Sequence, residues 1–171
     1  MSSRFDSGEE KQTDSQEQQY IMFTVADQKF AVDIMQTREI INMTELTDMP
    51  SSPDFIKGVV NLRGEIVPIV DLERRLDVSS LEMSSEKNQR IIIVSIDENL
   101  VGMQVSRVEG IIRLDADEVG EAPEITRGIH ENYIDGVGKL EEELVVILDL
   151  AGVLTAAEVE ELEEFEPEQG E

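Results

Sequence analysis

Few side chains in this chain have types and spacings that could support catalysis or metal binding. His130 is the only histidine and there is no cysteine, so a transition-metal site has no second ligand of either kind. Asp71 and Asp149 could form a pair of catalytic carboxylates. They occupy identical positions in a repeated unit, however, where an aspartate is better explained as a helix N-cap. The sequence therefore predicts no enzyme activity, no metal and no cofactor, and it makes His130 a solvated loop residue.

The repeated unit is a stretch of nineteen residues. It runs from Gly58 to Leu76 and returns 78 positions later, from Gly136 to Leu154, with nine identical pairs. A second echo relates Phe30–Ile41 to Val101–Ile112 at a spacing of 71. A fixed-period repeat indicates a duplicated supersecondary unit. The change in spacing places a length change in a loop, where it costs little.

We expect a mostly β chain made of two related halves. The alternation of apolar and polar residues predicts strands at Ile21–Val25 and Phe30–Ile34, joined by a turn at Ala26–Lys29. Arg90–Ile96 has the continuous apolar run of a strand buried on both faces. Two further expectations are a strand for Met35–Met43 and a one-turn helix for Ser52–Gly58. Pro68 should mark a sheet edge or a bulge, because proline cannot donate to a ladder.

The predicted organisation has tails on either side of one folded part. Residues 1–19 are polar and should be disordered, and the folded part covers residues 20–154. Its halves are about 20–76 and 90–154, with a mobile loop between them and with strands that need not stay in their own half. A capping box and an apolar stripe predict an amphipathic helix at 155–165, followed by a loose acidic tail at 166–171.

The net charge of −25 limits the partners. Residues 155–171 carry −8 and residues 1–19 carry −3, which leaves −14 on the middle of the chain. Such a surface repels phosphate backbones and anionic lipid, so we expect neither nucleic acid nor a membrane surface as a partner. Five lysines against 26 glutamates suit a salt-adapted cytoplasm, although an ordinary acidic protein is the alternative. No apolar run suggests a signal peptide or a membrane span, which favours a cytoplasmic location.

The two copies of the repeat differ most at their centre. The first copy has Asn61-Leu62-Arg63-Gly64 where the second has Lys139-Leu140-Glu141-Glu142. Shared residues report a common fold, so a function is best sought where the copies differ. The first segment is no phosphate loop, because it has one glycine and no following Lys-Ser or Lys-Thr. A tight turn at Arg63-Gly64 would instead present a guanidinium suited to pairing with carboxylates.

The run Phe55–Leu72, which contains Asn-Leu-Arg-Gly and Ile-Val-Pro-Ile-Val-Asp-Leu, closely resembles the signature of the CheW family of chemotaxis coupling proteins. Other matching segments are Gln28–Ile34, Arg38–Ile40, Ala122–Glu124 and Tyr133–Gly138, so the resemblance covers about residues 20–154. It implies an all-β fold of two pseudo-symmetric five-stranded SH3-like barrels, with a short C-terminal helix. It also implies a cytoplasmic adaptor, without catalysis, that joins chemoreceptor cytoplasmic tips to the regulatory domain of the histidine kinase CheA in receptor arrays, where the two can alternate in rings.

The resemblance suggests the residues of a receptor and kinase interface. Arg63 matches the family's coupling arginine, Glu39 matches an acid near the same surfaces, and Asn61 belongs to the same turn. The apolar residues Ile34, Val105 and Val108 would line a groove between the barrels that takes the receptor tip. For each of these residues a solvated surface role or core packing is the alternative. Structural roles at turns and caps are expected for Gly58, Gly64, Gly136, Asp71 and Asp149.

A second function class is a small-molecule-binding β-barrel sensor that uses the cleft between the halves. A pocket of about 300 Å³ or more with converging polar groups would favour it.

Overall fold

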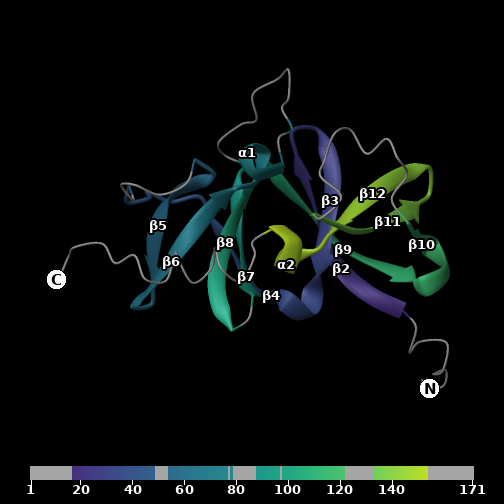
Figure 1. Cartoon of the computed structure of the whole chain (residues 1–171), viewed down its shortest axis with the longest axis horizontal. Helices are drawn as coiled ribbons and strands as arrows, with labels where there is room; N and C mark the ends of the chain where they lie inside the picture. The colour runs from purple at the N-terminus through teal and green to yellow at the C-terminus, as the bar shows by residue number, and fades with distance from the viewer. Residues whose placement is uncertain are drawn as a thin grey trace.

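A computed structural model describes residues 17–48, 54–76, 78, 88–96, 98–121 and 133–153 (Figure 1). The N-terminal tail was expected to reach residue 19, but Glu17–Gln19 already belong to the first strand and pair with residues 113–115. Several expectations fall on residues outside the described ranges. These are the tail at 1–16, Ser52 and Pro53, the loop residues 79–87, His130, the helix at 155–165 and the tail at 166–171.

The described chain is mostly β-strand. In chain order the elements of the first half are β2 (Glu17–Val25), β3 (Gln28–Asp33), the 3-10 helix η2 (Ile34–Gln36), β4 (Thr37–Asn42), β5 (Ile56–Leu62), β6 (Glu65–Asp71) and α1 (Leu72–Leu76). Those of the second half are β7 (Arg90–Ile96), β8 (Asn99–Val105), β9 (Arg107–Asp115), η3 (Ala116–Glu118), β10 (Val119–Gly120), β11 (Ile134–Leu140), β12 (Glu143–Leu148) and α2 (Leu150–Val153).

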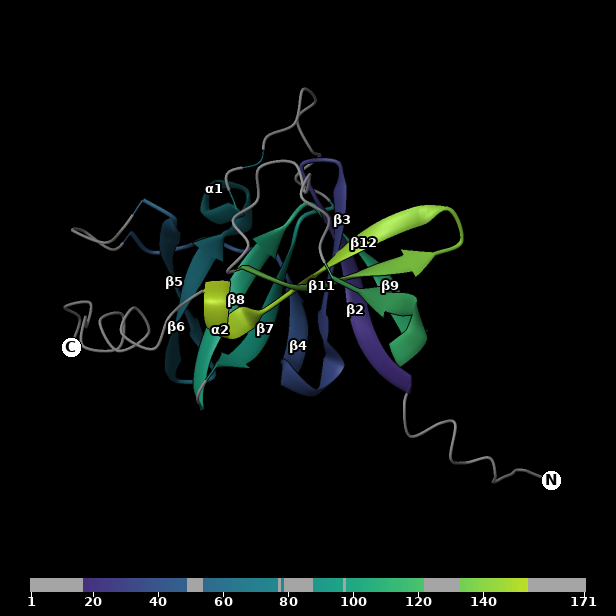
Figure 2. The ribbon, with the colours of Figure 1, turned by 45° about the vertical axis from the view of Figure 1, so that its right-hand side comes forward.

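The strands form two sheets that exchange hairpins between the halves. One sheet has the order β4-β7-β8-β6-β5, and the other has the order β10-β11-β12-β3-β2-β9. The hairpin β7–β8 of the second half therefore lies between β4 and β6 of the first half, and β2–β3 lies between β9 and β12 in return. Figures 1 and 2 show β5–β8 on one side of the molecule and β9–β12 on the other. We call the sheet of β4–β8 the first barrel and the sheet of β2, β3 and β9–β12 the second barrel.

The two barrels repeat the same register, so the predicted pseudo-symmetry is confirmed. Gly58 pairs with Ile69 in the first barrel, and Gly136 pairs with Ile147 in the second, each 78 positions further on. A register shift precedes each glycine at the same place, between Ile56 and Gly58 and between Ile134 and Gly136. The second sheet has six strands rather than the expected five because β10 pairs with β11 over two residues. An isolated bridge between Thr47 and Val59 takes that place in the first barrel.

Three apolar clusters fill the interior. One lies inside the first barrel and includes Ile91 and Ile93, and one lies inside the second barrel and includes Tyr20 and Ile147. The third and largest draws on strands of both barrels and contains Ile92 and Val94, among others. Successive side chains of a strand point to opposite faces. Strand β7 therefore sends one face into its own barrel and the other between the barrels, and the predicted burial of both faces is confirmed.

Some local expectations were wrong. Residues 54 and 55 form a turn and β5 begins at Ile56, so Ile56 and Gly58 lie in a strand and not at the end of a helix. Strand formation wins there because Ile56 and Val59 are buried and pair with β6. Met35 and Gln36 belong to η2, and the strand expected from Met35 starts at Thr37. Pro68 lies in the interior strand β6. The pairing of β6 with β8 begins one residue later, at Ile69, so the missing N–H of Pro68 does not interrupt the hydrogen bonds between these two strands.

Candidate functional site

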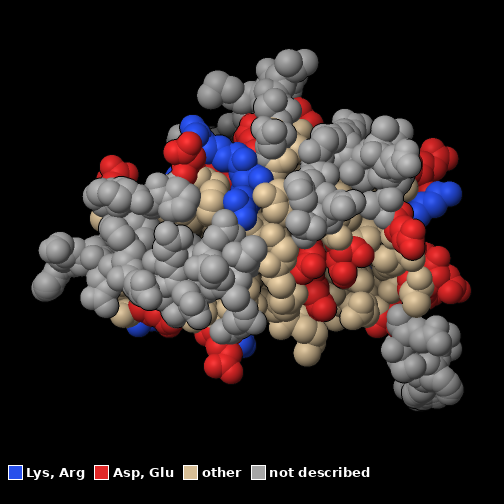
Figure 3. Space-filling view, viewed as in Figure 1, with Lys and Arg blue, Asp and Glu red and all other residues tan. Residues whose placement is uncertain are grey.

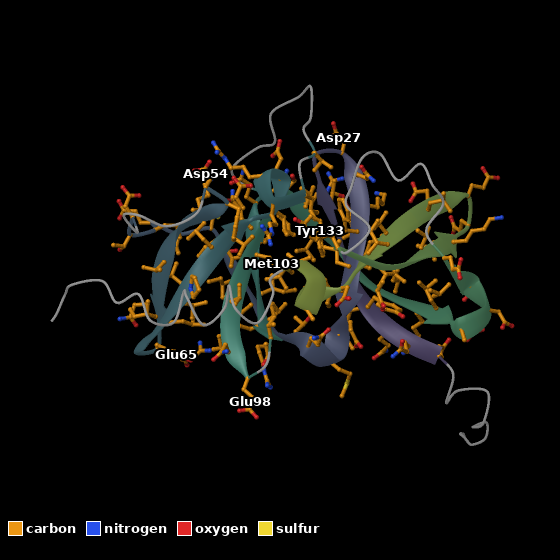
Figure 4. All side chains as sticks on the ribbon, viewed as in Figure 1. Asp27, Asp54, Glu65, Glu98, Met103 and Tyr133 are labelled. Carbon is orange, nitrogen blue, oxygen red and sulfur yellow. The ribbon has the colours of Figure 1, made fainter. Side chains whose placement is uncertain are left out.

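The segment where the two repeats differ is the turn between β5 and β6, at the outer end of the first barrel. We call residues 61–64 the first tip and residues 139–142 the second tip. Arg63 and Gly64 have φ values of 52° and 89°. Two central residues with positive φ match the right-handed twist of a hairpin, which is why a two-residue loop can connect these strands. Figure 4 shows the neighbouring Glu65 at the free end of this hairpin, away from the centre of the molecule.

Asn61 holds the shape of the first tip. Its side-chain Oδ1 accepts a hydrogen bond from the backbone N–H of Gly64 at 2.8 Å. This bond uses the single oxygen of the side-chain amide and links the two ends of the turn. The structure thus gives Asn61 a role in fixing the loop that carries Arg63, and its side chain remains exposed.

Arg63 and Glu39, which the sequence suggested separately, form one ion pair. The guanidinium is bidentate, with Nη1 donating to Glu39 Oε1 at 3.4 Å and Nη2 donating to Oε2. The pKa of Arg63 is raised above its usual value. The larger cause is the hydrogen bonding to Glu39, and the next is the attraction to its carboxylate charge. The side chain of Arg63 is still 72% exposed, whereas that of Glu39 is 30% exposed. The pair therefore fixes the guanidinium in one direction and leaves most of its surface open to a partner.

The ion pair joins opposite edges of the first sheet. Glu39 is on β4, which is one edge strand, and Arg63 follows β5, which is the other. Thr47 and Val59 add two backbone hydrogen bonds of 2.9 Å between the segment after β4 and the same strand β5. These contacts hold the two edge strands of the curled sheet together. Nothing in the sequence indicates that β4 and the first tip meet, because the contact depends on how the sheet curls.

The three apolar site candidates do not lie with Arg63. Val105 is 2% exposed within the cluster shared by the barrels, so it is a core residue and offers no surface to a partner. Ile34 and Val108 are half-buried and pack against that same cluster. Each of the three lies where the chain passes from one barrel to the other, so each packs against the cluster that the barrels share. Ile34 and Val108 keep partial exposure.

Sequence reasoning missed a set of exposed apolar side chains. Among the residues that the structure describes, five large hydrophobic side chains are markedly exposed: Met35, Ile40, Ile66, Ile111 and Leu144. Four of them form pairs at the repeat spacings, Ile40 with Ile111 and Ile66 with Leu144. A search along the repeats for outward-facing apolar pairs could have found these four. Met35, at 82% exposure, has no such signal, because its orientation depends on η2.

Asp71 and Asp149 are helix caps. Asp71 Oδ1 accepts from the backbone N–H of Glu73 at 3.1 Å, and Asp149 Oδ1 accepts from that of Ala151 at 3.1 Å. Gly58 and Gly136 lie inside strands at the register shifts and not in turns. A Cβ on Gly58 would be 2.7 Å from the carbonyl oxygen of Thr47, and one on Gly136 would be 2.9 Å from Val119. Only Gly64 of the three glycines occupies a turn.

A small cavity lies within the described part of the chain. It is lined by Val25, Asp71, Glu73, Gln89, Gln104, Val105 and Ser106, and its volume is about 20 Å³. That is room for about one water molecule. Within the described ranges no group of three or more His, Asp or Glu side chains could hold a metal ion. Over the same residues, no helix has the length and apolar character needed to cross a membrane.

Two pseudo-symmetric barrels with an ordered, solvent-facing arginine define a binding module of the SH3-like double-barrel class. Residues 19–158 match the family described as the CheW-like domain. The chemotaxis protein CheW of Klebsiella aerogenes is 32% identical over 142 residues, which are 83% of this chain and 84% of that protein. CheW of Rhizobium meliloti is 33% identical over 140 residues, covering 82% and 89%. The chain therefore belongs to the CheW-like family, as the signature indicated.

A solved structure supports the same assignment. The scaffolding protein TtCheW from Thermoanaerobacter tengcongensis superposes with a TM-score of 0.74 at 29% sequence identity. The match covers 81% of this chain and 93% of that one. The double-barrel fold is thus shared over nearly the whole length of the solved scaffold.

Proposed function

We propose that this protein is a chemotaxis adaptor that couples the cytoplasmic tips of chemoreceptors to the histidine kinase CheA. The observation that carries the proposal is Arg63, a family signature residue that stands on an ordered turn with most of its guanidinium exposed. Relatives that match over most of both chains are named chemotaxis proteins, and the solved relative is named a scaffolding protein. A scaffold needs surfaces rather than a reaction centre, so we also propose that the chain is not an enzyme.

The first barrel supplies a surface of the right kind for a protein partner. Arg63 provides a bidentate donor, and arginine is enriched where protein interfaces bind tightly. Ile40 on β4 and Ile66 on β6 of the same barrel are 40% and 44% exposed. Exposed arginine and apolar side chains are both usual components of protein interfaces. We assign this surface to the regulatory domain of CheA or to the receptor tip, within arrays at the cytoplasmic side of the membrane.

The half-buried pair Ile34 and Val108 is the part of the sequence-derived groove that remains accessible. We propose that a receptor helix contacts the junction of the barrels there, together with the adjacent Met35. An amphipathic helix placed against such a junction would use apolar anchors at helical spacing. Rings in which this protein alternates with the kinase domain follow from the same proposal, because two barrels offer two separate faces. Nucleic acid and anionic lipid are not proposed as partners, given the charge of −25.

A binding experiment tests the proposal directly. The full chain is titrated with the isolated CheA regulatory domain and, separately, with a soluble helical fragment of a receptor tip, with calorimetry as the readout. We expect saturable binding to both and a ternary complex on a sizing column. The control ligand is a helical hairpin of similar length and charge without receptor sequence. Loss of binding to both partners would refute the adaptor function.

The alternative sensor function has less support. The 20 Å³ cavity is far below the roughly 300 Å³ expected of a ligand pocket. Of the polar groups around it, Gln104 Nε2 donates to Gln89 Oε1 at 3.1 Å, whereas the buried Gln104 Oε1 has no hydrogen-bond partner among the described residues.

A further inference from the structure

We propose that Arg75 is a positioning residue that sets the angle between the two barrels. It lies on α1, the short helix that follows β6 of the first barrel. Its Nε donates a hydrogen bond of 2.7 Å to the backbone carbonyl of Val153, at the end of α2 of the second barrel. The bond connects residues 78 positions apart, so Arg75 bonds to the residue that occupies its own equivalent position in the other repeat.

The guanidinium also contacts one aromatic ring from each barrel. Its central carbon lies 4.2 Å from the ring centroid of Phe55 and 5.3 Å from that of Tyr133. Both distances fall within the range of a cation–π interaction, about 6 Å. Phe55 and Tyr133 are again 78 positions apart, so they are equivalent residues of the two repeats. Figure 4 shows Tyr133 near the middle of the molecule, between the two barrels.

Each ring is anchored in its own barrel by the same backbone bond. The carbonyl of Phe55 accepts from the N–H of Asp71 at 2.8 Å, and the carbonyl of Tyr133 accepts from the N–H of Asp149 at 2.9 Å. Those two aspartates cap α1 and α2. The unit of ring, cap and short helix is therefore built twice, and a single arginine connects the two copies.

The repeats differ at this point. An arginine in place of Val153 would bring a second positive charge toward the guanidinium of Arg75, which is unfavourable. The second repeat has Val153 there, which is 1% exposed and offers only its backbone oxygen. A carbonyl in the last turn of a helix lacks an intrahelical partner, so it is available to a side-chain donor.

The contact adds direction to an interface that contains a large apolar cluster. The cluster shared by the barrels contains Phe23, Leu72, Ile92 and Leu150, among others. Burial of such groups is favourable but non-directional. A hydrogen bond and two ring contacts fix both distance and angle. Removing Arg75 should therefore leave the barrels folded and associated while widening the range of angles between them. This inference stands independently of the proposed partners.

The test uses the absence of cysteine from the chain. Asn42→Cys on β4 and Lys139→Cys on β11 place one spin label on an exposed strand position of each barrel, and pulsed electron resonance measures the distance distribution between the labels. We expect a narrow distribution for the full chain with Arg75 and a distribution at least about twice as broad for Arg75→Met. Arg75→Lys keeps the positive charge but loses the planar guanidinium, and it should give a distance distribution of intermediate width. The matched control is Arg74→Met, on the exposed side of the same helix.

A second variant tests the same proposal in case Arg75→Met does not fold. Tyr133→Leu preserves apolar bulk and removes the ring, and it should broaden the same distribution without changing the circular dichroism spectrum. If Arg75→Met folds and its distribution superposes on that of the parent, the proposal is overturned. If Arg75→Met does not fold, superposable distributions for both Arg75→Lys and Tyr133→Leu overturn it equally.

Discussion

Arg63 and Glu39 form an ion pair that leaves most of the arginine side chain exposed. The pair joins two edges of the first barrel, yet the second barrel has Glu141 at the position of Arg63, with a positive φ of 56°, and its strands are also joined by a two-residue loop. The arginine is therefore not required for the turn. Exposed ion pairs contribute little to folding, which agrees with the recognition role that we propose for this residue.

A charge swap separates the two roles of the pair. Arg63→Glu alone places two carboxylates where a pair was, and the double change Glu39→Arg with Arg63→Glu restores opposite charges in reversed order. We expect the urea midpoint of the double variant to match that of the parent, because the local attraction is regained. Binding to the kinase regulatory domain should stay at least about tenfold weaker, because the partner would meet the wrong charge. Binding restored to the parental level would mean that the pair acts only within the barrel.

The sequence indicated Arg63 and Glu39 separately, but not that they form an ion pair. The signature and the mismatch between the repeats both indicate the first tip. Glu39 is one of 39 acidic residues, and its contact with Arg63 arises from the curl of a sheet whose edges are β4 and β5. Val105 is the opposite case. The family resemblance suggested that this apolar residue belongs to an interface, but its side chain is buried between the barrels.

At the scale of elements, the repeat explains why the same strands and helices form twice. The register of β5 with β6 recurs in β11 with β12, and a cap aspartate begins the following helix each time. Periodicity and repeat spacing therefore predicted these units well. The exchange of hairpins was only an open possibility, because pairing across halves depends on packing that alternation does not encode.

Gly58 provides a test at this scale. In Gly58→Ala the new Cβ would lie 2.7 Å from the backbone oxygen of Thr47, so the backbone must shift at one of these two positions. Overpacking of this kind costs about 1–3 kcal/mol, which should appear as a lower free energy of unfolding in urea. Gly120→Ala is the control, because its Cβ would meet nothing within 4 Å, and we expect a change within about 0.5 kcal/mol. Equal effects of the two changes would show that the approach of Thr47 is not what requires a glycine.

At the scale of the whole molecule, charge is the dominant feature beyond the fold. Figure 3 shows acidic side chains over both barrels and a smaller group of basic ones near the middle of that face. The charge of −25 must be accommodated when the chain becomes compact. We propose that the protein is adapted to a salt-rich cytoplasm.

Salt should therefore raise the stability. The Debye length falls from about 10 Å at 0.1 M to about 3 Å at 1 M, which screens repulsion between neighbouring surface acids. We expect the urea midpoint to increase by about 1 M between low and molar KCl, or about 2 kcal/mol at a typical slope for a chain of this size. The increase should be similar in KCl and NaCl if screening is the cause. A midpoint that is flat or falls with salt would remove the salt adaptation and leave the adaptor assignment unchanged.

We propose that this chain couples receptors to the kinase by presenting Arg63 to its partners. The most direct measurement is autophosphorylation of CheA reconstituted with receptor-bearing vesicles and this protein, compared between the parent, Arg63→Glu and Glu141→Arg. The parent and Glu141→Arg should stimulate the kinase to similar levels, because the second tip has no assigned partner. Arg63→Glu should reduce receptor-dependent activity at least about tenfold while its circular dichroism spectrum stays unchanged. Full stimulation by Arg63→Glu, or none by the parent, would contradict the account.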